Sequence, residues 1–280
     1  MKKLLTLLAL SGAVFTTTAA FSQNAPGGTL VPGAKYVALG SSFAAGPGVP
    51  EQLGACGRSS ANYPHLVSDA LDLALTDVSC SGATTDHILN TPQAESPLQI
   101  DAVTTDTALV TFTIGGNDIT FTSSTFACAG TAASARCTAN LDQAMINGAL
   151  EQLPSKLGAT LDAIRAKAPE AIIVLVTYPR IFLPDAASCS ELELSNEDTT
   201  YLTAMGQKLE DAFVNVVASR QALIADSYVR AEGHGPCEAA ISDRWVNGNK
   251  IAASGIRYHP TAEGHVEMAR LVVEALGRGD

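Results

Sequence analysis

The sequence predicts an α/β fold: one three-layer domain in which helices cover both faces of a mainly parallel sheet. Short apolar runs of strand length alternate along the chain with longer segments of helical periodicity. Several of these runs end directly in glycine or small polar residues, as at the carboxyl edge of such a sheet. Because parallel neighbours need crossover connections, the alternation favours a parallel sheet.

The composition fits a single domain behind an export signal. The 280 residues are 46% hydrophobic and only 16% charged, too apolar for extended disorder. We expect residues 1–22, with a lysine pair, an apolar stretch and small residues, to be a secretory signal peptide. Residues 23–34, rich in Gly and Pro, read as a flexible lead, and residues 35–280 as the domain. The apolar part of the leader is shorter than the roughly 20 residues needed to span a bilayer, so we expect secretion, extracellular or periplasmic, without stable membrane insertion.

The charge of the chain argues against polyanionic partners. Cleavage would remove Lys2 and Lys3, so the formal net charge of −11 would become −11 − 2 = −13. Such an excess of negative charge opposes binding to nucleic acid or to anionic lipid surfaces. We therefore expect no nucleic-acid partner, and we expect the exported protein to be a monomer.

Five strands and four main helices are expected along the chain. The first strand is the apolar run that begins near Lys35 and stops at Gly40. The other predicted strands are Leu75–Cys80, Thr107–Ile114, Ile172–Val176 and Ala222–Ala225. The predicted helices are Ala61–Leu73, Leu141–Ala168 with a break near Pro154, Asn196–Ser219, and Thr261–Leu276 with Thr261 as N-cap. The segment Phe121–Asn140 reads as irregular.

The end of the first strand carries the candidate nucleophile. Gly40 allows a sharp change of direction, and Ser41 and Ser42 follow it at once. The simpler interpretation is that serines beside a glycine only form a turn. A serine hydroxyl becomes a useful nucleophile when a base removes its proton, so a suitable histidine would favour the catalytic interpretation.

His259 is the best candidate for that base. The other histidines fall within or beside predicted helices, or, for His234, in a Gly- and Pro-rich loop. His259 stands on a loop immediately before Pro260, which favours an extended backbone and a side chain that projects from the loop.

Two further strand ends supply candidate donors for a developing oxyanion. Gly82 lies in a small-residue turn after the second strand, and Asn117 follows two glycines after the third. A backbone amide and a side-chain amide can both stabilise an oxyanion. Each residue taken alone could equally be an ordinary turn residue.

The cysteine count fits an exported protein with disulfides. The six residues are Cys56, Cys80, Cys128, Cys137, Cys189 and Cys237. An even number in an exported chain favours three disulfides over free thiols or a metal site, and no Cys-x-x-Cys pair is present. Fifteen pairings are possible. The sequential pairing is suggested because each such pair brackets loops near strand ends.

Together these residues resemble the four sequence blocks of the SGNH hydrolases, also called GDSL esterases and lipases. The blocks here are Gly40-Ser41-Ser42, Gly82 in its turn, Gly115-Gly116-Asn117-Asp118, and His259 in Tyr258-His259-Pro260-Thr261-Ala262-Glu263-Gly264-His265. The resemblance covers essentially the whole mature chain and is greatest to secreted actinobacterial-type lipases and esterases. It implies a flavodoxin-like five-stranded sheet and supports the sequential disulfides.

The resemblance also implies the site residues. Ser42 would be the nucleophile and His259 the general base, with an oxyanion hole formed by the Ser42 and Gly82 amides and the Asn117 side chain. Neither a cofactor nor a metal is implied. The chain departs from the family in having Ser41 where an aspartate is usual, and Ile256 three residues before the histidine, again where an aspartate is usual.

Something must hold the second ring nitrogen of His259 in the absence of that aspartate. Some relatives use a backbone carbonyl, so we expect the Ile256 carbonyl to do so. Asp226, at the end of the last strand, and Asp243 are weaker alternatives.

The predicted function is hydrolysis of carboxylic esters by a secreted serine esterase or lipase through an acyl-enzyme, on a small-molecule or lipid ester. Phospholipids and acetylated carbohydrates are alternative substrates, because loop shape decides the pocket on such folds. A non-catalytic binding protein on the same scaffold is the alternative from another class.

Overall fold

The fold is described from a computed structural model and covers residues 30–129, 137–182, 188–251 and 254–278. The predicted signal peptide, residues 1–22, lies outside this part of the chain. Leu30 is buried, its carbonyl accepts a hydrogen bond from Arg278 (2.8 Å), and the Gly33 amide donates to Asp72. Leu30 and Gly33 therefore contact the domain, while residues 31–33 are exposed. Residues 23–29 of the predicted lead lie outside the described residues.

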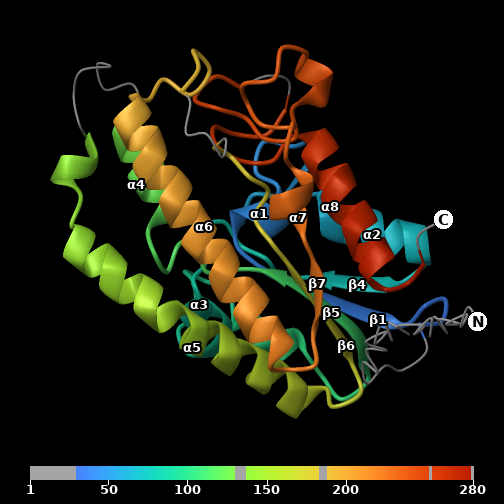
Figure 1. The fold of residues 1–280 in the computed structure, drawn as a ribbon. Helices are drawn as coiled ribbons and strands as arrows, with labels where there is room; N and C mark the ends of the chain where they lie inside the picture. Colours follow the sequence, from blue (N-terminus) through green and yellow to red (C-terminus); the bar gives the residue numbers. More distant parts are fainter. Residues whose placement is uncertain (1–29, 130–136, 183–187, 252–253, 279–280) are drawn as a thin grey trace, which may run out of the picture.

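Five parallel strands form the central sheet, in the order β4-β1-β5-β6-β7 (Figure 1). They are β1 (Lys35–Gly40), β4 (Ala74–Asp77), β5 (Thr107–Thr113), β6 (Ile172–Val176) and β7 (Leu223–Ala225). In chain order this arrangement is 2-1-3-4-5, the flavodoxin-like order that was predicted. The connections from β1 and β5 leave in opposite directions, so the carboxyl ends of these two strands border a crevice.

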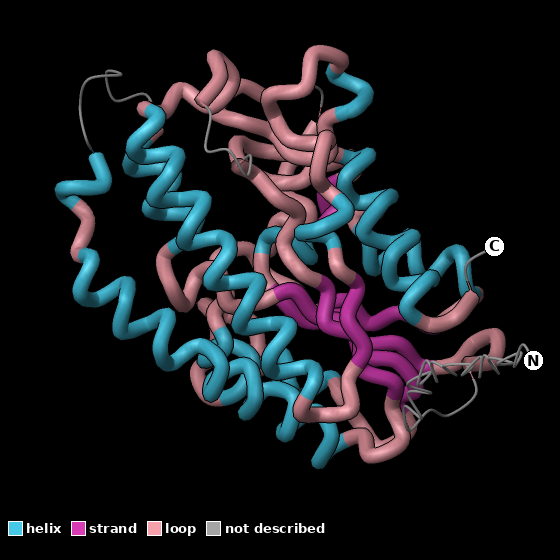
Figure 2. The backbone as a smooth tube through the Cα atoms, in the orientation of Figure 1, coloured by secondary structure: helices cyan, strands magenta, loops and turns pink. Residues whose placement is uncertain are grey.

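The main helices lie in two layers on either side of the sheet (Figure 1). Helices α2 (Tyr63–Leu71) and α8 (Ala262–Ala275) pack together on one face. The other face is covered by α3 (Thr85–Leu89), α5 (Gln143–Lys167) and α6 (Asn196–Ala218). Figure 2 shows the long loops gathered beyond one end of the strands.

Shorter elements complete the description. They are α1 (Ser42–Ala45), α4 (Phe121–Cys128), α7 (Ser227–Arg230), a hairpin of β2 (Gln52–Leu53) and β3 (Arg58–Ser59), and 3-10 turns at Gln99–Ala102, Cys137–Asn140 and Ile241–Asp243.

Alternation along the strands explains why both faces of the sheet are apolar. In β1, Val37 and Leu39 point into the core beneath α3, α5 and α6, while Tyr36 and Ala38 point into the core beneath α2 and α8. Successive strand residues face opposite sides, so a strand buried on both sides must be apolar throughout. This is why the strands read as continuous apolar runs.

The helical segments differ from the prediction at two places. Phe121–Cys128 is the helix α4, although Phe121–Asn140 was predicted to be irregular. This segment is rich in Ser and Thr, which are weak helix formers. Its packing against α6 provides the stabilisation that the helix lacks from its own sequence. Helix α5 also continues through Pro154, where a break was predicted. A proline has no N–H to donate to the carbonyl four residues before it, but Pro154 is exposed, so that carbonyl can bind water instead.

Other predictions are confirmed. Thr261 caps α8, with its hydroxyl accepting the Gly264 amide at 3.1 Å. The six cysteines form the sequential disulfides Cys56–Cys80, Cys128–Cys137 and Cys189–Cys237.

One buried acid makes the stability of the fold depend on pH. Glu210 on α6 is 4% exposed, and neither carboxyl oxygen makes a hydrogen bond of normal geometry among the described residues. Burial, and next the nearby charge of Asp226, raises the pKa of Glu210 from 4.5 to about 8. The protonated form therefore stabilises the folded state fully below about pH 4.5, and this contribution is lost as the pH rises through about 8.

We predict that Glu210→Gln stabilises the protein more at pH 8 than at pH 5. The cost of the buried acid at neutral pH is on the order of 3 kcal/mol, and the amide removes it because it cannot ionise. Urea unfolding at the two pH values measures the difference. Glu151→Gln, which replaces an exposed acid on α5, is the matched control. Equal effects of Glu210→Gln at both pH values would contradict the prediction.

Candidate active site

The chain leaves the sheet two residues before Ser42, at a position that only glycine can occupy. Gly40, the last residue of β1, has a φ of +135°, and a Cβ there would lie 2.5 Å from the Thr113 carbonyl oxygen on β5. The chain then turns directly into α1, of which Ser42 is the first residue. An amide in the first turn of a helix has no partner within the helix. The Ser42 hydroxyl and its amide are therefore both presented at the end of β1.

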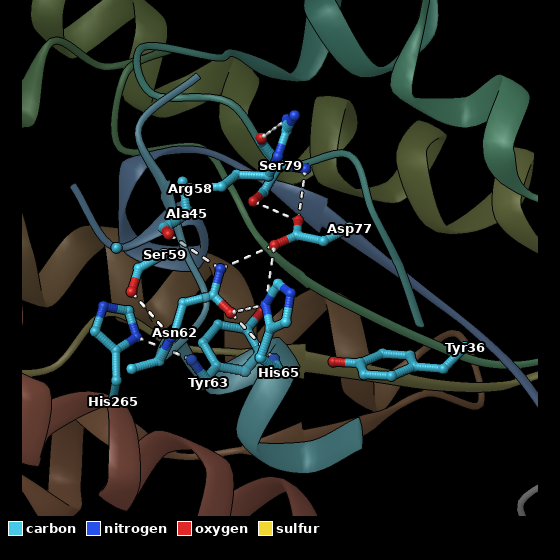
Figure 3. Close-up of polar contacts among 12 residues, drawn as sticks. Tyr36, Ala45, Arg58, Ser59, Asn62, Tyr63, His65, Asp77, Ser79 and His265 are labelled. Atoms are coloured by element: carbon cyan, nitrogen blue, oxygen red, sulfur yellow. Dashed lines mark hydrogen bonds and ion pairs between the residues drawn. The ribbon is translucent and has the colours of Figure 1, made fainter. Parts of the chain in front are cut away.

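Asn62 holds the other end of α1 (Figure 3). Its buried side-chain amide donates to the Ala45 carbonyl (3.0 Å) and to the Asp77 carboxylate (2.8 Å), and its oxygen accepts the His65 amide (3.0 Å). The Asp77 carboxylate also accepts the hydroxyl and the amide of Ser79. The short helix that presents Ser42 is thus tied to α2 and to the end of β4.

His259 approaches Ser42 from the loop before α8. Its Nε2 lies 2.7 Å from the Ser42 Oγ, although 217 residues separate the two in the chain. Both residues are buried, with exposed fractions of 2% for His259 and 7% for Ser42. This is the distance at which a histidine can take the proton of an attacking serine.

The other ring nitrogen of His259 is held by a backbone carbonyl. Nδ1 lies 2.8 Å from the carbonyl oxygen of Arg257. Because a carbonyl can only accept, Nδ1 carries the proton of the neutral ring, and Nε2 is free to accept from Ser42. The tautomer needed in a general base is therefore the one that the backbone selects.

The prediction that the Ile256 carbonyl orients His259 is wrong. That carbonyl accepts the backbone amide of His259 (3.3 Å) and the side-chain amide of Asn247 (3.2 Å). The bond to the His259 amide closes a tight turn, and Tyr258 within it has a φ of +55°. This turn presents the Arg257 carbonyl to the ring. Every residue carries a carbonyl, so no side-chain pattern could have singled out Arg257.

The two alternative acids are engaged elsewhere. The Asp226 carboxylate accepts the Val229 amide (2.9 Å) and so caps α7, and the Asp243 carboxylate accepts the Ser242 hydroxyl (3.2 Å). Within the described ranges, neither forms a hydrogen bond with His259.

The remaining histidines have structural contacts. His65 bonds Asn62, His87 closes the capping box of α3, His234 stacks on Trp245, and His265 accepts the Tyr63 amide (Figure 3).

Burial sets the protonation state of His259. Its ring centroid lies 4.7 Å from that of Phe43 and 6.2 Å from that of Phe126. Burial lowers the pKa of His259 from 6.5 to about 4, although the hydrogen bond to the Arg257 carbonyl acts in the opposite direction. At neutral pH the ring is uncharged and able to accept a proton.

Candidate oxyanion donors face the same edge of the sheet. Asn117 follows β5, and its side-chain Nδ2 donates to the Ala83 carbonyl at 2.9 Å. An NH₂ group has two hydrogens, so one remains available. Gly82 has a φ of +83°, and among the described residues neither its amide nor that of Ser42 donates a backbone hydrogen bond. Three candidate donors thus follow the carboxyl ends of β1, β4 and β5.

Tyr178, which sequence reasoning missed, occupies the space beside Ser41. Its hydroxyl lies 3.2 Å from the Ser41 Oγ and accepts the Gly116 amide at 3.0 Å. Hydrogen bonds between uncharged groups therefore join the end of β1 to the loop after β5. They lie at Ser41, the position where the family usually has an aspartate. The sequence did offer a sign of this role, because Tyr178 comes just after β6, and that strand ends at the same edge of the sheet.

No metal centre is evident in the described part of the chain. The one group with the spacing of metal ligands there consists of Cys128, Cys137 and Asp198, and the two sulfurs are bonded to each other. Among those residues, too, no helix has the length and apolar character needed to cross a membrane.

Comparison with known proteins agrees with the geometry. Residues 38–266 match the GDSL-like lipase/acylhydrolase family. Lipase 2 of Streptomyces coelicolor is 34% identical over 255 residues, which cover 86% of this chain and 85% of that protein.

Two solved structures are also similar. The extracellular lipase of Streptomyces rimosus superposes with a TM-score of 0.72 at 29% identity, covering 86% of this chain and 99% of that one. Phospholipase A1 of Streptomyces albidoflavus gives a TM-score of 0.69 at 28% identity, covering 89% of this chain and 100% of that one. With this fold and these relatives, the chain belongs to the GDSL-like lipase/acylhydrolase family, the SGNH hydrolases, and is a carboxylic ester hydrolase.

Proposed function

We propose that the protein is a secreted, monomeric serine esterase or lipase that cleaves carboxylic esters through an acyl-enzyme, with Ser42 as nucleophile and His259 as base. The observation that carries the proposal is the 2.7 Å contact between Ser42 Oγ and His259 Nε2, with Nδ1 held by the Arg257 carbonyl. No metal or organic cofactor is required for these steps.

In the first half-reaction, the Ser42 Oγ attacks the ester carbonyl carbon while Nε2 of His259 takes the hydroxyl proton. The imidazolium that forms keeps its Nδ1–H bond to the Arg257 carbonyl. The carbonyl oxygen becomes an oxyanion and accepts hydrogen bonds from the Ser42 amide, the Gly82 amide and the Asn117 side chain. A single donor of this kind contributes about 10²–10³ in rate in well-studied hydrolases.

The first half-reaction ends when His259 gives this proton to the leaving alcohol as the ester C–O bond breaks, and the acyl group stays on Ser42. In the second half-reaction, water attacks the acyl carbon while Nε2 of His259 takes a proton from it. The bond to the Ser42 Oγ then breaks, His259 returns the proton to that oxygen, and the acid product leaves. The Arg257 carbonyl contributes a dipole but no charge to the imidazolium, so we infer a Ser-His dyad assisted by the backbone.

Secretion is supported by three features. Residues 1–22 have the composition of a leader, the chain carries three disulfides, and one similar structure is that of an extracellular lipase. Disulfides persist in oxidising compartments.

We predict that Ser42→Ala abolishes both ester hydrolysis and covalent labelling by a fluorophosphonate probe. The loss of turnover should reach at least about 10³-fold, because Ser42 is the hydroxyl that contacts the base. Hydrolysis of a p-nitrophenyl ester and mass spectrometry of the labelled protein measure the two effects.

Ser41→Ala is the matched control. It should still be labelled at residue 42, since Ser41 contacts Tyr178 and not His259. A label found on Ser41, or turnover by folded Ser42→Ala, would reject the assignment.

The depressed pKa of His259 predicts activity that persists in acid. The active base is the neutral ring, which exists above its pKa, so kcat/KM should stay level from pH 8 to about pH 5 and be half lost near pH 4. An exposed histidine would give half loss near 6.5.

Folding must be checked in the same experiment. Because the pKa of His259 is lower in the folded protein than in the unfolded chain, the folded state loses stability as the pH falls from about 6.5 through 4. Samples returned from each pH to pH 7 should regain full activity if only the base titrated. Half loss near pH 6.5 in protein that stays folded would contradict the assigned environment.

A phospholipase activity is the second candidate, favoured by the similarity to the Streptomyces albidoflavus phospholipase A1. The loops decide which ester enters the site. Release of the sn-1 fatty acid from a phospholipid, at a rate comparable with that for the best p-nitrophenyl ester, would support it. Cleavage of simple esters or of an acetylated sugar, with no phospholipid turnover, would reject it.

A further inference from the structure

Side chains of two consecutive residues join the two segments that carry the candidate oxyanion donors. The turn with Gly82 follows β4, and the loop with Asn117 follows β5. The Asn117 side chain donates to the Ala83 carbonyl at 2.9 Å. The next residue, Asp118, accepts both the amide (3.0 Å) and the hydroxyl (2.5 Å) of Thr85. The two segments are thus bonded on the carboxyl side of Gly82.

Asp118 is a buried carboxylate with a full set of partners. Its side chain is 1% exposed, and Lys156 Nζ on α5 lies 3.5 Å from it. A buried carboxylate is costly unless it is hydrogen-bonded and paired, and satisfied buried networks make a structure rigid. Thr85 is itself buried and is the first residue of α3, which packs on α5. Asp118 therefore fixes the start of α3 relative to the loop after β5.

We propose that Asp118 is a positioning residue for the oxyanion hole, acting through Thr85. By holding Thr85, it sets the separation between the Gly82 amide and the Asn117 side chain, which come from different strands. The inference rests on the proposed function, in which both groups bind the oxyanion. Displacement of a catalytic group by about 1 Å can cost about 10² in rate, so this link matters for the reaction as well as for folding.

Catalytic constants separate positioning from a purely structural role. Asp118→Ala should lower kcat for a p-nitrophenyl ester about 10- to 100-fold while KM stays within about threefold, because the oxyanion exists only in the transition state. Binding of a boronic acid, whose adduct with the serine is tetrahedral, should weaken by a similar factor. Asp118→Asn should recover part of the loss, since its oxygen can still accept from Thr85.

Two further variants guard against a folding artefact. Thr85→Val removes one hydrogen-bond donor to Asp118 without changing the shape, and should reduce kcat in the same direction by a smaller factor. Asp101→Ala is the matched control, because among the described residues the Asp101 side chain forms only an exposed pair with Lys167 (3.3 Å), a kind of pair that contributes little, and its loss should leave kcat within twofold. Melting temperatures are measured for all variants.

Coupling to Asn117 completes the test. Asp118→Ala should cost much less in an Asn117→Ala background than in the native protein, because one of the two donors that it positions is then absent. Lower melting temperatures with unchanged kcat and boronic acid affinity in Asp118→Ala and Thr85→Val would overturn the assignment of Asp118 alone. Native kcat in Asn117→Ala, with Ser42→Ala inactive, would overturn the oxyanion hole and this inference together.

Discussion

The contact between Ser42 and His259 depends on the order of the strands. Ser42 follows β1, while His259 follows the last strand by more than thirty residues and sits just before α8. Helix α8 packs on the face of the sheet beneath β6 and β7 and against α2, so its first turn is carried to the carboxyl edge. Without this crossover the two residues, 217 positions apart, would not meet. The parallel sheet is thus the frame of the site.

Neutral dipoles occupy the positions where the family usually has carboxylates. The Arg257 carbonyl holds His259, and Tyr178 bonds Ser41 and the loop after β5. A dipole fixes the tautomer of the histidine but stabilises the imidazolium less than a charge would. Combined with burial, this leaves the pKa of His259 low, so the ring is a weak base that stays neutral in mild acid.

Two buried carboxylates, Asp77 and Asp118, bind residues that support the segments around the site. The side chains of Asp77 and Asp118 are 4% and 1% exposed, and each accepts two hydrogen bonds from a single neighbour, Ser79 for Asp77 and Thr85 for Asp118. Asp77 acts through Asn62 on α1, and Asp118 acts through Thr85 on α3. Buried carboxylates whose hydrogen bonds are satisfied in this way make the surrounding structure rigid.

The sequence by itself determined the α/β class and most strands, and it offered Ser42, Gly82, Asn117 and His259 as candidates. These follow from apolar periodicity, turn residues and side-chain chemistry, all of which are local properties. The sequential disulfide pairs were only suggested by the placement of the cysteines and supported by the family resemblance. Tertiary structure alone decided that Arg257 holds His259, that Tyr178 bonds Ser41, and that α4 is a helix. A backbone carbonyl has no signature in side-chain identity, and a weak helix former is decided by what packs on it, so both depend on contacts that exist only after the chain has folded.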